Sequence, residues 1–134
     1  MWLPDTNVWI AYLNPRPSAV KPAMRAHPVS DLYLCDVVKA ELFFGAFKSQ
    51  RMEANLAVLD DLFQHFNSLP FDGAAAREFG QMRAELQRAG TPIGPYDLQA
   101  AIALAHDFTL VTHNTDEFKR VQGLRFVDLE ADIV

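Results

Sequence analysis

The sequence lacks several features that define other classes of protein. Cys35 is the only cysteine among 134 residues, so no internal disulfide can form and we expect a reducing compartment. No apolar run approaches the roughly 18 residues that span a bilayer, and no basic segment followed by an apolar one marks a secretory signal. We therefore expect a soluble cytoplasmic protein with no membrane partner.

The chain also lacks an excess of positive charge. Its formal net charge is −5, which argues against affinity for nucleic acid through bulk charge. Any contact with nucleic acid must therefore use local basic groups or metal ions. Half of the residues are apolar and 22% are charged, which is typical of a globular protein. The length suits a single domain over residues 1–134 with a core of its own.

Short apolar segments alternate along the chain with segments of helical periodicity. We expect strands at residues 2–4, 32–35, 68–71, 108–112 and 125–127. We expect helices at residues 8–13, 18–26, 37–47 and 51–66, between 72 and 90, from 95 to 105, and from 114. This alternation predicts an α/β fold, a three-layer α/β/α arrangement with a mainly parallel central sheet.

The first strand ends at Asp5, where the chain turns into an apolar helix. In open α/β sheets, ligands bind beyond the carboxyl ends of the strands, so an acid at this junction is a candidate functional group. Taken alone, capping of the helix by Asp5 or Asn7 is the simpler explanation, because their side-chain oxygens accept free backbone N–H groups. The helix is apolar on nearly every side, which predicts burial from several directions.

Three further acids stand in helices next to strands. Glu41 follows the second strand, whereas Asp97 opens the helix before the strand at residues 108–112 and Asp116 opens the helix after it. Each has an ordinary explanation, as an exposed helical acid or as a charge favoured by the helix dipole. A doubly wound sheet would bring all four acids to one rim, where carboxylates repel one another unless cations neutralise them. Such hard oxygen ligands select Mg²⁺ or Mn²⁺, which support phosphodiester hydrolysis.

Four segments at these junctions carry recognisable motifs. They are residues 3–7 (LPDTN), residues 39–42 (KAEL) with Gly45 and Ala46, residues 90–98 (GTPIGPYDL) and residues 110–118 (LVTHNTDEF). In this order they resemble the PIN-domain family and, within it, the VapC toxins of bacterial toxin–antitoxin pairs. One such motif is unspecific, whereas four in order are specific. With residues 123–125, the resemblance covers nearly the whole chain.

The resemblance implies a PIN-like endoribonuclease that depends on Mg²⁺ or Mn²⁺, forms a homodimer and is held inactive by a cognate antitoxin. Asp5 and Asp97 match the family's principal metal ligands, and Glu41 matches its second conserved acid. Asp116, or Asn114, falls at the fourth position. All four acids are therefore candidate catalytic and metal-binding residues.

The residues beside these acids are expected to support them. Thr6 and Thr112 are expected to orient carboxylates through their hydroxyls, with Asn7 and Asn114 as further supporting residues. Asn114 is also predicted to cap the next helix in a capping box with Glu117, which favours Asp116 as the fourth functional residue. Because Asn114 is neutral where many relatives carry an acid, the number of metal ions stays open.

Aromatic residues suggest where a partner binds. Phe43, Phe44 and Phe47 are more aromatic surface than one helix face can hide, and core packing explains them equally well. By resemblance, these residues and Trp9 of the first helix line an antitoxin groove. Phe43 and Phe44 replace a more polar pair that is common in the family.

Two other functions compete with RNA cleavage. One is a catalytically inert PIN-like binding protein that engages an antitoxin or RNA. The other is phosphotransfer to Asp5, which needs a second acid beside it that Leu3 and Pro4 do not supply. The four histidines lack metal-ligand spacing, and no glycine-rich phosphate loop is present. Lys39, Lys48, Arg51, Lys119 and Arg120 are candidate phosphate contacts, although solvated surface explains most of them.

Overall fold

The strands form a parallel sheet at the centre of the molecule. A computed structural model describes residues 1–130, apart from the side chain of Pro95. Its strands are β1 (Trp2–Pro4), β2 (Tyr33–Cys35), β3 (Asn67–Leu69), β4 (Thr109–Val111) and β5 (Phe126–Val127). β1 pairs with β4, β4 with β5, and β2 with β3, and a parallel bridge between Trp2 and Leu32 joins the two sets. The strand order is therefore β3–β2–β1–β4–β5, as the expected parallel sheet requires.

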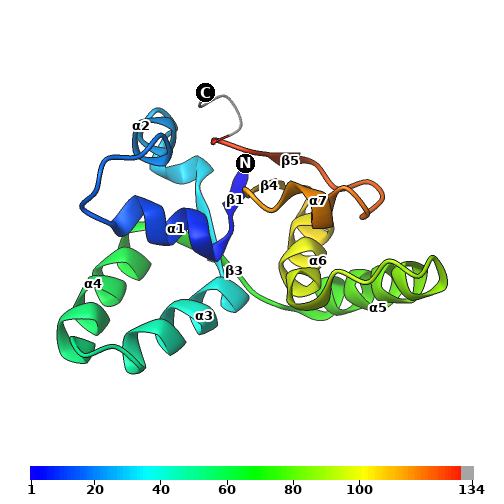
Figure 1. Ribbon diagram of the computed structural model, residues 1–134, viewed down its shortest axis with the longest axis horizontal. Helices are drawn as coiled ribbons and strands as arrows, with labels where there is room; N and C mark the ends of the chain where they lie inside the picture. Colours follow the sequence, from blue (N-terminus) through cyan, green and yellow to red (C-terminus); the bar gives the residue numbers. More distant parts are fainter. Residues whose placement is uncertain (131–134) are drawn as a thin grey trace.

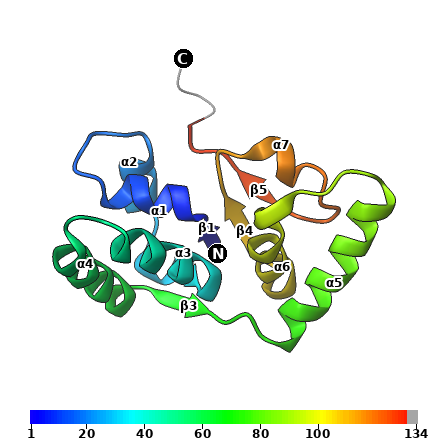
Figure 2. The same cartoon turned by 60° about the horizontal axis from the view of Figure 1, so that its bottom comes forward.

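Helices cover both sides of this sheet. They are α1 (Thr6–Leu13), α2 (Val20–Arg25), α3 (Asp36–Phe47), α4 (Met52–His65), α5 (Gly73–Arg88), α6 (Asp97–His106) and α7 (Thr115–Phe118). Both views show α1 to α4 on one side of the strands and α5 to α7 on the other (Figures 1 and 2). The predicted α/β class and layered arrangement are confirmed. Within residues 1–130, no helix has the length and apolar character that crossing a membrane requires.

The first helix is less buried than its sequence predicts. Val8 and Trp9 are buried, but the Ile10 side chain is 48% exposed. Trp9 packs edge-on against Phe66 and Tyr12, with ring centroids 4.9 and 5.7 Å apart. The prediction of burial from several directions is therefore wrong, because α1 lies against the core along one face and leaves its opposite face to solvent.

The helices begin in different ways. Asp72 caps α5, since its Oδ1 accepts the Ala75 N–H at 3.0 Å. Ala19 holds the cap position of α2, which has no side-chain cap. Asp36 is the first residue of α3, after Cys35 at the cap position. Pro95 lies in a 3-10 turn, Gly94–Tyr96, so α6 begins only at Asp97.

The predicted capping box at α7 is also wrong. Asn114 occupies the N-cap position, but its side chain makes no capping hydrogen bond. Its backbone N–H instead donates to the Thr112 hydroxyl at 3.0 Å. The argument that capping occupies the Asn114 side chain therefore fails.

Asp72, whose side chain caps a helix, and Asn114, whose side chain does not, can be compared by mutation. We expect Asp72→Ala to lower the free energy of unfolding by about 1 kcal/mol, because it removes a capping bond. We expect Asn114→Ala to change it by less than about 0.5 kcal/mol, as substitutions that break no such contact do. Urea denaturation of both variants measures this. Equal losses at both positions would contradict the assignment of the caps.

Candidate active site

The carboxyl ends of β1 and β4 bring Asp5 and Thr112 together. The register pairs Pro4 with Val111, and the Asp5 N–H continues the ladder by donating to the Val111 carbonyl at 2.9 Å. The Thr112 hydroxyl donates to Asp5 Oδ2 at 2.6 Å. Two residues that are 107 positions apart in the sequence thus meet because their strands are neighbours.

Asp5 is both a helix cap and a candidate functional acid. Its Oδ1 accepts the Val8 N–H at 2.9 Å, which caps α1. Only 3% of Asp5 is exposed. A carboxylate oxygen can accept more than one hydrogen bond or ligand, so both Asp5 oxygens keep acceptor capacity after these contacts. The two interpretations of Asp5 that the sequence left open are therefore compatible.

The charge of Asp5 is unfavourable without a positive partner. Burial raises the pKa of the Asp5 carboxyl above its ordinary value, while hydrogen bonds from Thr112 and from the Val8 N–H oppose the rise. The negative charge of Glu41 raises the Asp5 pKa further. Asp5 and Glu41 are thus close enough to repel each other, and a cation near both would relieve that repulsion.

Glu41 reaches this edge from α3 and contacts a residue that the sequence analysis missed. Gln99 Nε2 donates to Glu41 Oε1 at 3.1 Å and lies 3.4 Å from the Thr6 hydroxyl. Gln99 is 3% exposed, whereas Glu41 faces solvent. The signal in the sequence was a lone amide in the otherwise apolar stretch between Asp97 and His106.

Asp97 lies at the same edge of the sheet. It is the first residue of α6, two positions before Gln99, and 9% of it is exposed. Its carboxylate makes no hydrogen bond with another described residue. The contacts of Gln99 with Thr6 and Glu41 hold this first turn of α6 beside the start of α1. Asp97 is therefore a buried acid whose oxygens are uncommitted.

The remaining candidates lie further out. The Asp116 side chain is 87% exposed, and its Oδ1 lies 3.6 Å from Lys119 Nζ. Asp116 does not converge with Asp5 and Glu41 into one group of three metal-binding acids. The Asn7 side chain is exposed, and its backbone N–H contributes a hydrogen bond to Asp5. Thr112 links the Asn114 N–H to Asp5, because its hydroxyl accepts the first and donates to the second.

The donor set fits a hard divalent cation with water as its other ligands. Within residues 1–130, no three His, Cys, Asp or Glu side chains converge closely enough to hold a metal ion by themselves. The expected convergence of four acids is therefore not seen. Asp5 and Glu41 supply two carboxylates, and Mg²⁺ commonly binds proteins through one or two carboxylates while keeping several waters.

An apolar groove of about 500 Å³ runs beside Glu41 between α1, α3 and α4. Its lining includes Ile10, Leu13, Leu42, Gly45, Val58 and Leu59, together with Glu41 itself. This is not the groove that the aromatic residues predicted. Trp9 is fully buried in the core and cannot contact a partner.

The three phenylalanines of α3 lie outside this groove. Phe43 packs on Phe63 with ring centroids 5.3 Å apart. Phe44 and Phe47 are 55% and 60% exposed, and Lys48 Nζ lies 4.9 Å from the centre of the Phe44 ring. The α3 surface that forms the groove is that of Leu42 and Gly45, because this surface faces α1 and α4.

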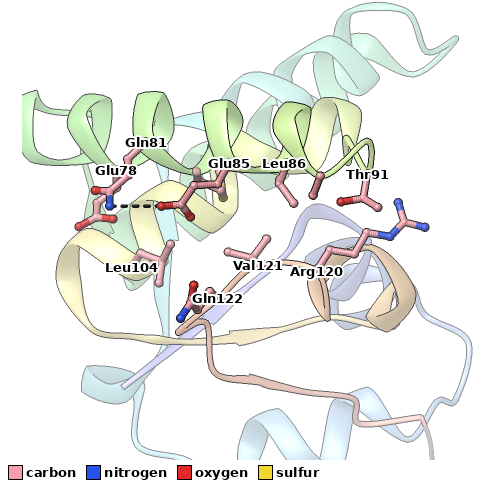
Figure 3. A pocket seen from close by; sticks show the side chains of 11 residues that line it. Glu78, Gln81, Glu85, Leu86, Thr91, Leu104, Arg120, Val121 and Gln122 are labelled. Carbon is pink, nitrogen blue, oxygen red and sulfur yellow. Dashed lines mark hydrogen bonds between the residues drawn. The ribbon is translucent and has the colours of Figure 1, made fainter.

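A second pocket, of about 470 Å³, lies on the other side of the molecule. It is formed between α5 and the segment that follows α7, with Glu85 and Arg120 on opposite walls (Figure 3). A hydrogen bond of 3.4 Å joins Gln81 to Glu85 on the α5 wall (Figure 3). None of the four candidate acids lines this pocket, so it is separate from the acidic edge.

Comparisons with known proteins identify the family of this chain. The PIN domain family model matches residues 2–124. The tRNA(fMet)-specific endonuclease VapC of Shigella flexneri is 40% identical over 125 residues, which cover 92% of this chain and 94% of that protein. Ribonuclease VapC2 of Haemophilus influenzae is 34% identical and covers 90% of this chain and 92% of that protein.

Solved structures give the same result for the fold. The DNA-bound VapBC complex of Salmonella typhimurium contains a chain that matches with a TM-score of 0.87 and 36% identity, covering 96% of this chain and 97% of that one. VapBC-1 of nontypeable Haemophilus influenzae matches with a TM-score of 0.82 and 31% identity, with the same two coverages. The chain therefore belongs to the PIN-domain family and, within it, to the VapC ribonucleases.

Proposed function

We propose that this protein is the toxin of a toxin–antitoxin pair and hydrolyses RNA phosphodiester bonds at the edge formed by Asp5, Glu41 and Asp97, with Mg²⁺ or Mn²⁺ as cofactor. The observation that carries the proposal is the buried Asp5 carboxylate, oriented by Thr112 and Val8 and repelled by Glu41. A protein that only binds RNA gains nothing from an acid in this position, because the acid repels phosphate.

The residues of the proposed site would have different roles in catalysis. Asp5, Glu41 and Asp97 would hold the cation together with water molecules, since the three carboxylates do not converge closely enough to hold it by themselves. When bound, the cation supplies positive charge for the phosphate oxygens and makes water a better nucleophile. Thr112 and the Val8 N–H fix both oxygens of Asp5 in one orientation. Asp97 has no hydrogen bond with other described residues that would compete for its oxygens.

Transfer RNA is the substrate class that we propose first. The Shigella flexneri relative is named for tRNA(fMet) and shares 40% identity over 94% of its own length. The acidic net charge of this chain makes strong non-specific binding to RNA unfavourable, which fits an enzyme that cleaves selected RNAs.

We propose that the groove beside Glu41 holds a segment of the antitoxin. The chain resembles chains in solved VapBC complexes over nearly its whole length. An apolar segment in the groove would bury the exposed side chains of Ile10 and Val58. Homodimer formation stays a prediction from the family resemblance.

The first prediction from this proposal concerns Asp97. Asp97→Asn should abolish cleavage of total RNA and tRNA while leaving the fold intact, because Asn keeps the shape of Asp but binds Mg²⁺ more weakly. Its melting temperature should stay the same or rise, since one charge leaves a repelling set. Gel assays with Mg²⁺, with Mn²⁺ and with EDTA measure cleavage.

Asp60→Asn is the matched control for this variant. Asp60 is an exposed acid on α4, so its substitution changes the net charge equally without touching the proposed site. It should cleave as the wild type does. Full cleavage by a folded Asp97→Asn protein would contradict the proposed site, and a wild type that cleaves no RNA would favour the inert binding protein instead.

A second prediction concerns the fourth polar position. Asp116 is exposed, so we expect it to act on the cation only through water and to contribute less than Asp97. Asp116→Asn should lower cleavage less than Asp97→Asn does and should raise the Mg²⁺ concentration needed for half-maximal rate. Parallel Mg²⁺ titrations of Asp116→Asn and Asn114→Ala decide between the two residues. A shift in Asn114→Ala alone would reverse the assignment.

A third prediction tests the groove. Ile10→Lys should abolish co-purification with the antitoxin encoded by the adjacent small reading frame, because it puts a charge where an apolar segment binds. Phe47→Lys should leave co-purification unchanged, since Phe47 is exposed outside the groove. The opposite pattern would show that the exposed aromatic surface of α3 is the docking site.

A further inference from the structure

The amide of Gln99 connects three helices at the acidic edge. Its Nε2 donates to Glu41 Oε1 of α3 at 3.1 Å, and a longer contact of 3.4 Å reaches the Thr6 hydroxyl of α1. Gln99 itself belongs to the first turn of α6, directly after Asp97 and Leu98. These partners are 58 and 93 positions away in the sequence, so the contacts depend on the finished fold.

Glu41 has little else to fix its side chain. It projects from the second turn of α3 into solvent, and its hydrogen bond with Gln99 is its one polar side-chain contact among the described residues. An exposed glutamate has three rotatable bonds, and ordering it opposes binding through lost rotamer freedom. Gln99 is 3% exposed and held by packing, so it is a rigid donor for a mobile acceptor.

A neutral amide is the suitable donor at this point. A lysine or arginine would neutralise Glu41 and compete with a cation for its oxygens. An acid would add to the repulsion that already raises the pKa of Asp5. The amide donates a hydrogen bond to one oxygen of Glu41 and leaves its negative charge in place, which is how metal-binding carboxylates are usually supported.

The other end of the same amide is unsatisfied. Gln99 Oε1 is buried and has no hydrogen-bond partner among the described residues. Buried acceptors without a donor are rare in native proteins and point to a water molecule or ion that completes them. Oε1 is bonded to the same carbon as Nε2, so the unsatisfied acceptor is part of the amide group that contacts Glu41 and Thr6. A water of a hydrated cation would supply the missing donor.

We infer that Gln99 is a positioning residue for the divalent cation, which orients Glu41 through Nε2 and accepts a hydrogen bond from a cation-bound water through Oε1. This inference rests on the proposed function, because it assigns Gln99 a role toward the cation of that site. In this role Gln99 would act through Glu41 and water, without contacting RNA or the reacting phosphate.

The test compares Gln99→Met with Ile102→Val. Met keeps the length of Gln and removes both the donor and the acceptor. Ile102 is a fully buried apolar residue of the same helix, so Ile102→Val perturbs packing without removing a polar group. Two quantities are measured: the rise in melting temperature that Mg²⁺ or Mn²⁺ produces without RNA, and the metal concentration for half-maximal cleavage.

We expect Gln99→Met to raise both metal midpoints by about 10- to 100-fold, the usual effect of removing a group that supports a metal ligand. Excess metal should restore its kcat, and the KM for RNA should not change. Ile102→Val should lower the melting temperature in EDTA and leave both midpoints unchanged. Thr6→Val, which removes only the weaker contact of Gln99, should shift the midpoints in the same direction by less.

Each outcome decides the inference. If Gln99→Met and Ile102→Val behave alike in the metal titrations, Gln99 is a packing residue and the inference is overturned. If Gln99→Met does not fold, Thr6→Val with an unchanged midpoint overturns it and a raised midpoint supports it. If the wild type neither cleaves RNA nor gains stability from metal, the proposed function fails, which is distinct from a failure confined to Gln99.

Discussion

The parallel pairing of β1 with β4 is the contact on which the acidic edge depends. It sets Pro4 opposite Val111, and the residues that follow, Asp5 and Thr112, must then lie side by side. The hydrogen bond from the Asp5 N–H to the Val111 carbonyl extends this register by one residue beyond the strand. A shift of one residue would turn the Asp5 side chain to the other face of the sheet. The register therefore fixes which side chains share the edge.

Asp5 shows how one side chain satisfies both the fold and the chemistry. A buried charge is unfavourable, and the Val8 N–H and the Thr112 hydroxyl recover part of that free energy through hydrogen bonds. The recovery is incomplete, because burial and Glu41 still raise the Asp5 pKa. The ionised Asp5 carboxylate is therefore still less stable than it would be in water, and a bound cation would stabilise it. A buried carboxylate that the fold does not fully neutralise is therefore the kind of group that a cation would stabilise.

The sequence predicted the features that depend on neighbouring residues in the chain. It did not predict the features that depend on packing between elements. The alternation of strands and helices was predictable, as were the junction positions of Asp5 and Asp97, because each follows from neighbours in the chain. Gln99 was missed, since a lone amide in an apolar helix has no meaning until Thr6 and Glu41 are placed beside it. Trp9 was misassigned, because residues of other elements, such as Phe66, decide which face of α1 is buried.

Glu41 lies where the two proposed functional surfaces of the molecule meet. It is hydrogen-bonded to Gln99 at the acidic edge, and it also lines the apolar groove between α1, α3 and α4. Residues three or four positions apart are neighbours on the surface of a helix. Leu42 and Gly45, which follow Glu41 on α3, therefore line the groove beside it. A chain segment lying in the groove would thus end beside the carboxylate that Gln99 orients. Any charge on that segment would change the electrostatic potential at Asp5 as well, because Asp5 and Glu41 are already coupled. If the groove holds an antitoxin segment and the acidic edge holds a cation, as proposed, the two events would be linked through the side chain of Glu41.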